Sequence, residues 1–422
     1  MRIALVARRL DRAGGAETYL ETVINALIEA GHAVALLASE GRSSSDPLRI
    51  SDACTVVLAG TEGTVEAIDE LRRWRPEIVF SQGLDDLDTE AAAMALAPSA
   101  LFAHDYYGTC ISGTKLFQGA SPQPCEQPFG AACLANYFPR RCGGRSPITM
   151  LRRYAFETRR HTLLKRYSAI LTASRHMRAH FIVNGCREDQ VRVVGLPIRE
   201  QPSTPPANLT PRGEGTRQPH RILFLGRMTT LKGGQLLIHA LPLVRSELAR
   251  PLTVTMAGHG PARSAWQAAA GRINSDGISI EFPGWIESSA VSKLFDCADL
   301  LVLPSVWPEP FGMTGLEAGL RGVPTVAFAV GGIPEWLHDD VNGYLASELT
   351  ADALASAMIR VLRDPAAHAR LRAGARATAS SFNTAVHIEK LISAFADIAS
   401  QRAGSRPVHS HGHDSGTAEN RD

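Results

Sequence analysis

Short, almost continuously apolar runs alternate with longer amphipathic segments through the first half of this sequence. The apolar runs lie at residues 2–8, 33–38, 77–82, 100–104, 169–174 and 191–195. Helical patterns occupy segments between them, such as 17–30 and 148–167. Strands that are apolar on both faces suit a parallel sheet covered by helices on either side. The pattern therefore predicts an α/β fold of the Rossmann-like, doubly wound type.

One proline-rich segment, residues 200–220, interrupts this alternation. It holds five prolines and almost no large apolar residue, which is typical of an interdomain linker. A second series of apolar runs follows, at residues 221–227, 253–258, 278–282, 299–305 and 325–330. We therefore expect two Rossmann-like, doubly wound domains that face a central cleft, an N-terminal one at 1–199 and a C-terminal one at 221–382.

The last part of the chain carries three more helical patterns, at residues 351–362, 365–380 and 384–400. We expect the terminal helix, within 383–401, to return toward the N-terminal domain. Residues 402–422 are polar and rich in His, Ser and Gly, a composition typical of a disordered tail.

Bulk composition excludes several classes of protein. The 422 residues carry a formal net charge of +2, so no global field favours nucleic acid. The first apolar run is shorter than a signal-peptide core, and the seven cysteines are an odd number, which does not favour a disulfide framework. We expect a cytoplasmic protein, with association at a membrane surface as the alternative.

Ligands of doubly wound sheets bind beyond the carboxyl ends of the strands, so we expect the functional residues at those ends. Gly14 and Gly15 precede a helix after the first strand, where backbone N–H groups can approach an anion. A simple chain turn explains this pair equally well. Arg227 and Lys232 stand at the end of a later strand, before another helix. They suit a diphosphate, because the Arg227 guanidinium can donate two parallel hydrogen bonds and the Lys232 ammonium is a compact positive charge. The alternative for this pair is two solvated surface charges.

The stretch SVWPEPFGMTGLEAGLRGVP, residues 305–324, places Glu309 before a predicted helix and Glu317 within it. The helix is expected over 312–320, because two prolines exclude an earlier start. Its first turn presents free N–H groups at the positive end of the helix dipole, on Gly312, Met313 and Thr314. Two carboxylates on either side of an anion site predict a ligand with hydroxyls at both ends and phosphate in the middle, such as a nucleoside diphosphate sugar.

The motifs AGGAE, LGRMTTLKGG, AGHGP, FPGWI, PSVWPEPFGMTGLEA and GVPTVAFAVGGIPE, in this order, resemble those of the retaining glycosyltransferases of family 4. That family has the GT-B fold, and the resemblance extends from residue 2 to about residue 400. It implies a transferase that moves a sugar from a UDP- or GDP-sugar to a hydroxyl acceptor, which is a glycan, a lipid-linked molecule or a small molecule. It implies no cofactor, and we expect no metal at the site.

The resemblance also implies roles for individual residues. Arg227 and Lys232 would hold the donor diphosphate, Glu309 the transferred sugar and Glu317 the ribose. The catalytic set would be His104, Arg227, Lys232 and Glu309. The donor-binding set would be Gly14, Gly15, Gly258, Trp285, Ile286, Gly312, Met313, Thr314 and Glu317.

Residues 106–145 form a cysteine-bearing insertion on the expected acceptor side. A loop this long inside a compact domain suits a lid or an acceptor-binding element. Its four cysteines leave three alternatives open, an all-thiolate zinc site, paired disulfides or free thiols: Cys110, Cys125, Cys133 and Cys142. The basic, aromatic segment 150–167 that follows is either a solvated helix face or a contact with acidic lipid or a polyprenyl-phosphate acceptor.

Two other functions remain as alternatives to a sugar transferase. A UDP-sugar 2-epimerase would share the two-domain form but should show additional acid and base carboxylates in the cleft. A non-catalytic two-domain ligand-binding protein would not need the concentration of Arg227, Lys232 and the two glutamates at one site.

Overall fold

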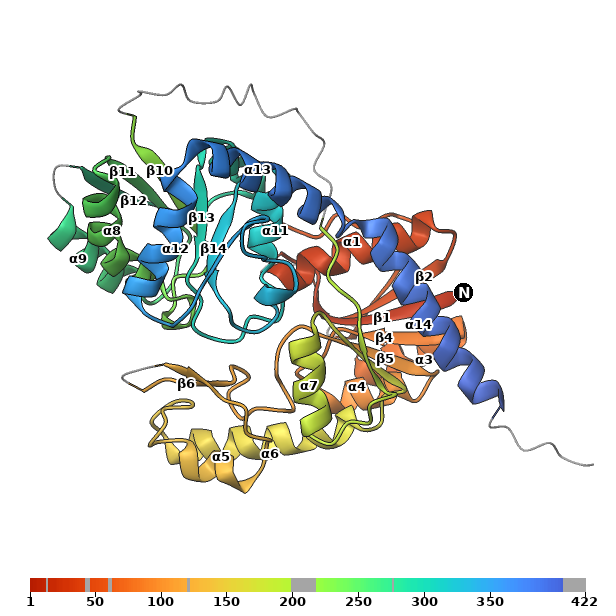
Figure 1. Cartoon of the computed structure of the whole chain (residues 1–422). Helices are drawn as coiled ribbons and strands as arrows, with labels where there is room; N and C mark the ends of the chain where they lie inside the picture. Colours follow the sequence, from red (N-terminus) through yellow and green to blue (C-terminus); the bar gives the residue numbers. More distant parts are fainter. Residues whose placement is uncertain are drawn as a thin grey trace, which may run out of the picture.

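The computed structural model describes residues 1–12, 14–41, 46–59, 63–119, 122–198, 218–274 and 277–404. Its body consists of two parallel β-sheets with their helices, one sheet in each half of the chain (Figure 1). The predicted fold class, two doubly wound α/β domains, is confirmed. Most of the predicted linker, 199–217, and of the predicted tail, 405–422, lies outside the described residues.

The N-terminal domain contains a seven-stranded sheet in the order β3-β2-β1-β4-β5-β8-β9. Its strands are β1 Arg2–Arg9, β2 Ala33–Glu40, β3 Thr55–Leu58, β4 Ile78–Ser81, β5 Ser99–Ala103, β8 Ala169–Thr172 and β9 Val191–Val193. Its helices are α1 Gly15–Glu29, α3 Thr64–Trp74, α4 Leu87–Met94, α6 Pro147–Leu164 and α7 Arg175–Val183. The insertion adds the hairpin β6 Leu116–Phe117 and β7 Gln123–Pro124, and the short helix α5 Ala131–Asn136.

The C-terminal domain contains a six-stranded sheet in the order β12-β11-β10-β13-β14-β15. Its strands are β10 His220–Leu225, β11 Leu252–Ala257, β12 Ile278–Gly284, β13 Leu300–Leu303, β14 Thr325–Phe328 and β15 Gly343–Ala346. The helical segments are η1 Thr230–Lys232, α8 Gly234–Leu248, α9 Arg263–Ile273, α10 Ser288–Cys297, α11 Met313–Leu320, η2 Ile333–Glu335, α12 Ala351–Arg363, α13 Pro365–Ser380 and α14 Thr384–Gly404.

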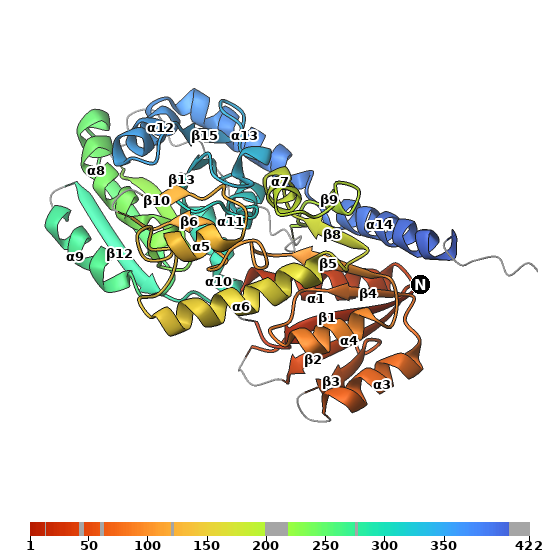
Figure 2. The ribbon, with the colours of Figure 1, turned by 90° about the horizontal axis from the view of Figure 1, so that it is seen from below.

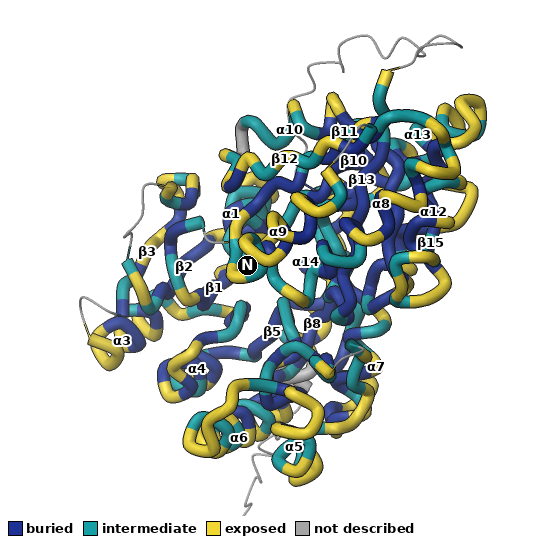
Figure 3. The backbone as a smooth tube through the Cα atoms, turned by 90° about the vertical axis from the view of Figure 1, so that its left-hand side faces the viewer, coloured by how far each residue is buried: buried dark blue, intermediate teal, exposed yellow. Residues whose placement is uncertain are grey.

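Alternate residues of β1 explain why the strand is apolar on both faces. Ile3 and Leu5 belong to the core cluster that includes α1, whereas Ala4 and Val6 belong to the cluster that includes α3. The central strands are accordingly buried along their length, while the outer surfaces of α5 and α6 are exposed (Figure 3). This two-sided burial is what a parallel sheet requires.

Two of the four edge strands, β3 and β15, lie outside the predicted apolar runs. Two of the four residues of β3 are exposed, so this strand has no continuous apolar run. β15 is short and starts at Gly343, which pairs with Thr325 of β14. Edge position alone does not explain this, because the edge strands β9 and β12 lie in predicted runs. Two boundaries also differ from expectation, since His220 already belongs to β10 and α14 continues to Gly404.

Helix α14 leaves the C-terminal domain and lies along the N-terminal one (Figures 1 and 2). His387 of α14 forms a 3.1 Å hydrogen bond with the hydroxyl of Tyr19 on α1, and Asp397 pairs with Arg192 at 2.6 Å. At the crossing point the Ile198 N–H donates to the Phe382 carbonyl at 2.7 Å. The last helix therefore fastens one domain to the other.

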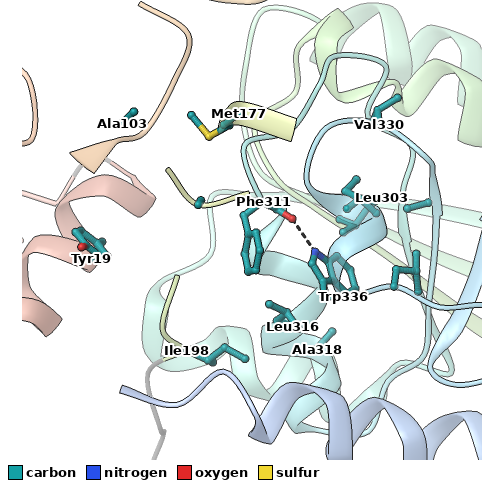
Figure 4. Packing of buried hydrophobic residues seen from close by; sticks show 14 of the residues in the cluster. Tyr19, Ala103, Met177, Ile198, Leu303, Phe311, Leu316, Ala318, Val330 and Trp336 are labelled. Atoms are coloured by element: carbon teal, nitrogen blue, oxygen red, sulfur yellow. Dashed lines mark hydrogen bonds between the residues drawn. The ribbon is translucent and has the colours of Figure 1, made fainter. Parts of the chain in front are cut away.

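Trp336 anchors the core of the C-terminal domain behind α11. Its side chain is 1% exposed, and its indole N–H donates to the Phe311 carbonyl at 2.7 Å (Figure 4). The ring lies directly against Gly315, where an added Cβ would come within 2.0 Å of the indole. Helix α11 can approach Trp336 this closely only because position 315 has no side chain.

Replacement of Gly315 tests this packing. Gly315→Ala should lower the free energy of unfolding of the C-terminal domain by about 1–3 kcal/mol, the usual cost of overpacking a core. Gly271→Ala is the matched control, because position 271 is also helical but an added Cβ meets no atom within 4 Å. This control should be neutral or stabilising by up to about 1 kcal/mol. Urea denaturation followed by tryptophan fluorescence measures both variants, and equal stabilities would contradict the assignment.

Candidate active site

Both sheets have a topological switch point, where the strand order reverses and a crevice opens at the carboxyl ends. In the C-terminal domain this point lies between β10 and β13. The loop after β10 carries Lys232, and the loop after β13 carries Glu309. Lys232 Nζ donates to Glu309 Oε1 at 2.6 Å. The sheet topology thus joins two predicted site residues that are far apart in sequence.

Glu309 is a buried carboxylate, only 7% exposed. Besides Lys232, the Ser305 hydroxyl donates to the same oxygen, Oε1, at 2.5 Å. The other oxygen, Oε2, has no hydrogen-bond partner among the described residues. A buried carboxylate is stable when a cation and a hydrogen bond compensate its desolvation. Here both partners engage one oxygen, which leaves the second able to accept a hydrogen bond from a ligand hydroxyl.

Two glycines set the backbone of this pair. Gly331 has φ +59°, and an added Cβ would lie 2.0 Å from the Glu309 carbonyl oxygen. Gly233, which follows Lys232, has φ +63°, and its Cβ would lie 1.8 Å from the Pro304 carbonyl oxygen. Only glycine fits such conformations and contacts without strain. The close packing of these turns therefore determines where Lys232 and Glu309 meet.

The other predicted donor residues lie at the same carboxyl edge of the C-terminal sheet. Arg227 is exposed after β10 and has no ion pair among the described residues. Gly312 is the N-cap of α11, so the positive end of this helix begins beside the Glu309 loop. The rest follow β11 and β12 or lie in the first turn of α11: Gly258, Trp285, Ile286, Met313 and Thr314. Trp285 is 75% exposed.

Glu317, the second glutamate, extends from α11 one turn beyond the helix start. Its carboxylate is accessible to solvent, although protein groups surround it closely, and the resulting desolvation raises its pKa. Its neighbours Leu316 and Ala318 are buried, which fixes the direction of the helix. Along the chain, Glu309 precedes the α11 N-terminus and Glu317 follows it by about one turn.

His104 follows β5 in the N-terminal domain and lines a cavity of about 180 Å³. Its Nε2 lies 2.8 Å from Gln82 Oε1. Burial lowers the pKa of His104 to about 4, so the imidazole is neutral at pH 7. Ala16 and Glu17 of α1, which directly follow Gly14 and Gly15, line the same cavity. Three arginines of β1 and α6 also line it: Arg8, Arg9 and Arg160.

An aromatic cluster that the sequence patterns did not indicate joins the two domains. Tyr106 is fully buried, and its ring centroid lies 6.4 Å from that of Trp307 in the Glu309 loop and 6.3 Å from that of His176 on α7. Burial raises the pKa of Tyr106, and the nearby Glu309 charge raises it further. The Tyr106 segment therefore lies next to Glu309 across the domain boundary.

Three polar atoms of this cluster are buried without a hydrogen-bond partner among the described residues, namely Tyr106 Oη, Trp307 Nε1 and His176 Nε2. Buried polar groups nearly always have a partner, so unpaired ones require an explanation. Their position beside the Lys232–Glu309 pair suits hydrogen bonding to a polar ligand. Tyr106 could have been suspected from sequence, because it stands two residues after His104 at a strand end.

A second contact across the domains involves the GGIPE motif. Glu335, at the end of η2, accepts a hydrogen bond from the backbone N–H of Arg175 in the first turn of α7. Its other oxygen lies 3.8 Å from Arg175 Nε. A carboxylate at a helix N-terminus satisfies a free N–H group and the dipole. This capping interaction closes the N-terminal domain onto the loop that supports Glu309.

All four cysteines of the insertion are free thiols in the structure. Among the described residues, no group of three or more His, Cys, Asp or Glu side chains is arranged to hold a metal ion. Burial raises the pKa of Cys142 to about 12 and raises those of Cys125 and Cys133. In the part of the chain that is described, no helix is both long and apolar enough to cross a membrane.

Comparison with protein families identifies both halves of the chain. The family described as "Glycosyl transferases group 1" matches residues 219–364, and the family described as "Glycosyl transferase 4-like domain" matches residues 14–197. An uncharacterised glycosyltransferase of Methanocaldococcus jannaschii is 35% identical over 145 residues, 34% of this chain and 36% of that protein. The D-inositol 3-phosphate glycosyltransferase of Xylanimonas cellulosilytica is 32% identical over 188 residues, 44% of this chain and 43% of that protein. The match thus spans less than half the length of these relatives.

Solved structures share the whole architecture. Sucrose-phosphate synthase from Thermosynechococcus elongatus aligns with a TM-score of 0.68 at 18% identity, covering 95% of this chain and 99% of that one. Anabaena HepE in complex with UDP and glucose aligns with a TM-score of 0.64, also at 18% identity, over 94% and 99% of the two chains. At this identity the likeness shows the fold alone.

Asp105, beside His104 in the 180 Å³ cavity, allows a test of the electrostatics. Burial raises its folded-state pKa to about 6, against an unfolded value of about 3.9. The folded protein therefore binds the proton more tightly, and this residue makes the unfolding free energy fall as pH rises from about 4 to about 6. Asp105→Asn should gain stability relative to wild type across that window, by at most about 3 kcal/mol, and stay level above it.

Asp86→Asn is the control, because its stability relative to wild type should change with pH in the opposite direction. Asp86 caps α4, and the hydrogen bond from the Thr89 hydroxyl holds its pKa below the usual value. Its contribution to stability is present above pH 4 and is lost as pH falls, so the variant should lose stability relative to wild type as pH rises. Urea denaturation over a series of pH values measures both differences. A flat difference for Asp105→Asn would disprove the raised pKa.

Proposed function

Because the chain belongs to the group 1 glycosyltransferases and has their two-domain GT-B fold, we propose that it is a retaining enzyme. It transfers a sugar from a nucleoside diphosphate sugar to a hydroxyl acceptor. The observation that supports this most is the Lys232–Glu309 pair at the β10/β13 switch point, beside the N-terminus of α11. This arrangement offers positive charge for a diphosphate and a carboxylate oxygen for a sugar hydroxyl.

Cleavage of the donor leaves negative charge on the diphosphate, and three groups of the protein stabilise this charge. Arg227 and Lys232 supply positive charge, and the first turn of α11 adds N–H groups and the helix dipole. Such preorganised electrostatic stabilisation is often the largest part of catalysis. Glu309 holds the hydroxyls of the transferred sugar, and Glu317 holds the ribose.

The acceptor enters from the N-terminal domain, through the cavity beside His104. Its hydroxyl attacks the anomeric carbon on the face that the diphosphate leaves, while donating its proton to the departing phosphate oxygen. The glycosidic bond forms as the sugar–phosphate bond breaks, and the configuration is retained. His104, neutral at pH 7, serves as a hydrogen-bonding group here and adds no charge.

The donor in this proposal is a UDP- or GDP-sugar. The HepE structures contain UDP and UDP-glucose, which supports a nucleotide-sugar donor. No cofactor or metal is needed for the transfer. The acceptor is a glycan, a lipid-linked molecule or a small molecule. We also propose a cytoplasmic location with membrane contact through α6, whose outer face exposes Ile148, Leu151, Arg152 and Arg153.

The proposal is tested by incubating the protein with UDP-, GDP- and ADP-sugars, with and without cell-extract acceptors. One donor should release nucleotide in an acceptor-dependent way, and the product should carry the donor's anomeric configuration by NMR. A chelator should leave the rate unchanged. Lys232→Met should reduce the rate by at least about a hundredfold, whereas the remote change Lys390→Met should not. Conversion of the donor to its 2-epimer without transfer would overturn the proposal.

The two glutamates should differ in what they do. Glu309→Gln keeps the side-chain size and a hydrogen-bond acceptor but removes the negative charge opposite Lys232. It should lower the turnover rate more than the affinity for the donor, because the contact with Glu309 is used mainly in the transition state. Glu317→Ala should weaken binding of the bare nucleoside diphosphate by about 1–3 kcal/mol. Calorimetric titration of both variants is the measurement, with Glu29→Gln on α1 as a distant control. Equal losses of nucleotide affinity in Glu309→Gln and Glu317→Ala would refute the separate roles.

A further inference from the structure

A second cavity, of about 560 Å³, lies between the cysteine-bearing insertion and the C-terminal domain. In Figures 1 and 2 the insertion, with β6 and α5, extends from the N-terminal domain toward the strand ends of the C-terminal sheet. The insertion contributes most of the lining residues, Leu116, Gln118, Gly119, Pro122, Tyr137, Phe138, Arg141, Gly143, Gly144 and Arg145. The C-terminal domain contributes Thr230 and Val306.

The two residues from the C-terminal domain connect this cavity to the proposed transfer site. Thr230 begins η1, the turn that ends at Lys232. Val306 follows Ser305, whose hydroxyl donates to Glu309. The Val306 N–H donates to the Leu231 carbonyl at 2.9 Å, so the two segments form one continuous wall. A ligand in this cavity would therefore lie against the loops that hold the Lys232–Glu309 pair.

Hydrogen bonds within the insertion hold the cavity wall in place. Tyr137 is fully buried, and its hydroxyl accepts a hydrogen bond from the Gly144 N–H at 2.9 Å. The Gln118 N–H donates to the Arg140 carbonyl at 3.0 Å, which ties the hairpin to the segment after α5. Arg141 has φ +50°, a left-handed conformation that is unfavourable for a residue with a side chain. The fold thus holds Arg141 at the cavity at a conformational cost.

The charge of the lining has one sign. Among the described residues that line it, Arg141 and Arg145 are the only charged ones, and none is acidic. Neither arginine has an ion pair among the described residues. The whole insertion, 106–145, carries Lys115, Arg140, Arg141 and Arg145 against the single acid Glu126. By contrast, the arginines of the 180 Å³ cavity face carboxylates, since Arg8 pairs with Asp85 at 2.7 Å.

We propose that this cavity binds the phosphate group of a phosphorylated acceptor, with Arg141 and Arg145 as its ligands. Guanidinium groups suit phosphate because they donate two parallel hydrogen bonds to it. Phe138, 42% exposed at the cavity, offers an apolar surface to the part of the acceptor next to the phosphate. This inference rests on the proposed function and narrows its acceptor class. The donor diphosphate has its own cations, Arg227 and Lys232.

Glucose 6-phosphate and glucose serve as matched probes that differ only in the phosphate. Their binding to the full chain is measured by NMR in saturating UDP and in saturating GDP, which keeps the probe away from Lys232. The wild-type protein should bind glucose 6-phosphate at least about tenfold more tightly than glucose. The double variant R141Q/R145Q should lose this preference, and R141K/R145K should keep part of it. Arg73→Gln, an exposed arginine on α3, is the control and should change nothing.

A second arm distinguishes a soluble phosphate from a lipid-linked one. Vesicles of phosphatidylcholine with and without phosphatidylglycerol are sedimented with wild type and with R141Q/R145Q. Arginine-dependent binding to the anionic vesicles would support a lipid-linked acceptor. If glucose 6-phosphate binds no better than glucose, and the vesicles bind both proteins equally, the inference is wrong. If the proposed function were wrong and this inference right, the wild-type protein would bind neither UDP nor GDP. It would still bind glucose 6-phosphate more tightly than glucose.

Discussion

A buried carboxylate at the boundary between the two domains is the constraint on which the rest of this site depends. Glu309 is removed from water and must be compensated, and Lys232 and Ser305 provide that compensation through one oxygen. The compensation works only if the loops after β10 and β13 pack almost in contact. The glycines at 233 and 331, the proline-rich approach to α11 and the buried Trp336 behind that helix all serve this packing. The Lys232–Glu309 ion pair, the glycine turns and the packed core behind α11 therefore depend on one another.

The relation between the two domains is the second physical theme. Glu335 caps α7 from the opposite domain, Tyr106 lies against Trp307, and α14 returns to contact Tyr19. These contacts place the His104 segment beside the Lys232–Glu309 pair. Three buried polar atoms at this boundary have no hydrogen-bond partner among the described residues, so they can donate to or accept from a polar ligand. The insertion adds a further contact between the domains, and the charged residues among the described lining of its cavity are both arginines.

Much of the fold could be predicted from local pattern. Central strands such as β1 and β4 are buried on both faces and so appear as apolar runs, and α13 starts at a proline and is confirmed over Pro365–Ser380. The strand β3 was not predicted, because two of its four residues are exposed, and β15 was not predicted, because it has only four residues and starts at a glycine. In the candidate site, Arg227, Lys232 and Glu309 were predicted because charged residues at strand ends are conspicuous, and the structure pairs Lys232 with Glu309. Tyr106, His176 and Trp307 were missed, because a single aromatic residue looks the same in a core as at an interface.

The sequence by itself determined the two-domain α/β class, the family resemblance and the identity of the charged groups at the strand ends. Each of these depends on local composition or on residues close together in the chain. Only the tertiary structure decided that Lys232 pairs with Glu309, that Glu335 caps a helix of the other domain, and that Arg141 and Arg145 line a cavity against Thr230. The physical reason is that these contacts join residues distant in sequence. Their geometry follows from strand order and domain packing, which no short stretch of sequence contains.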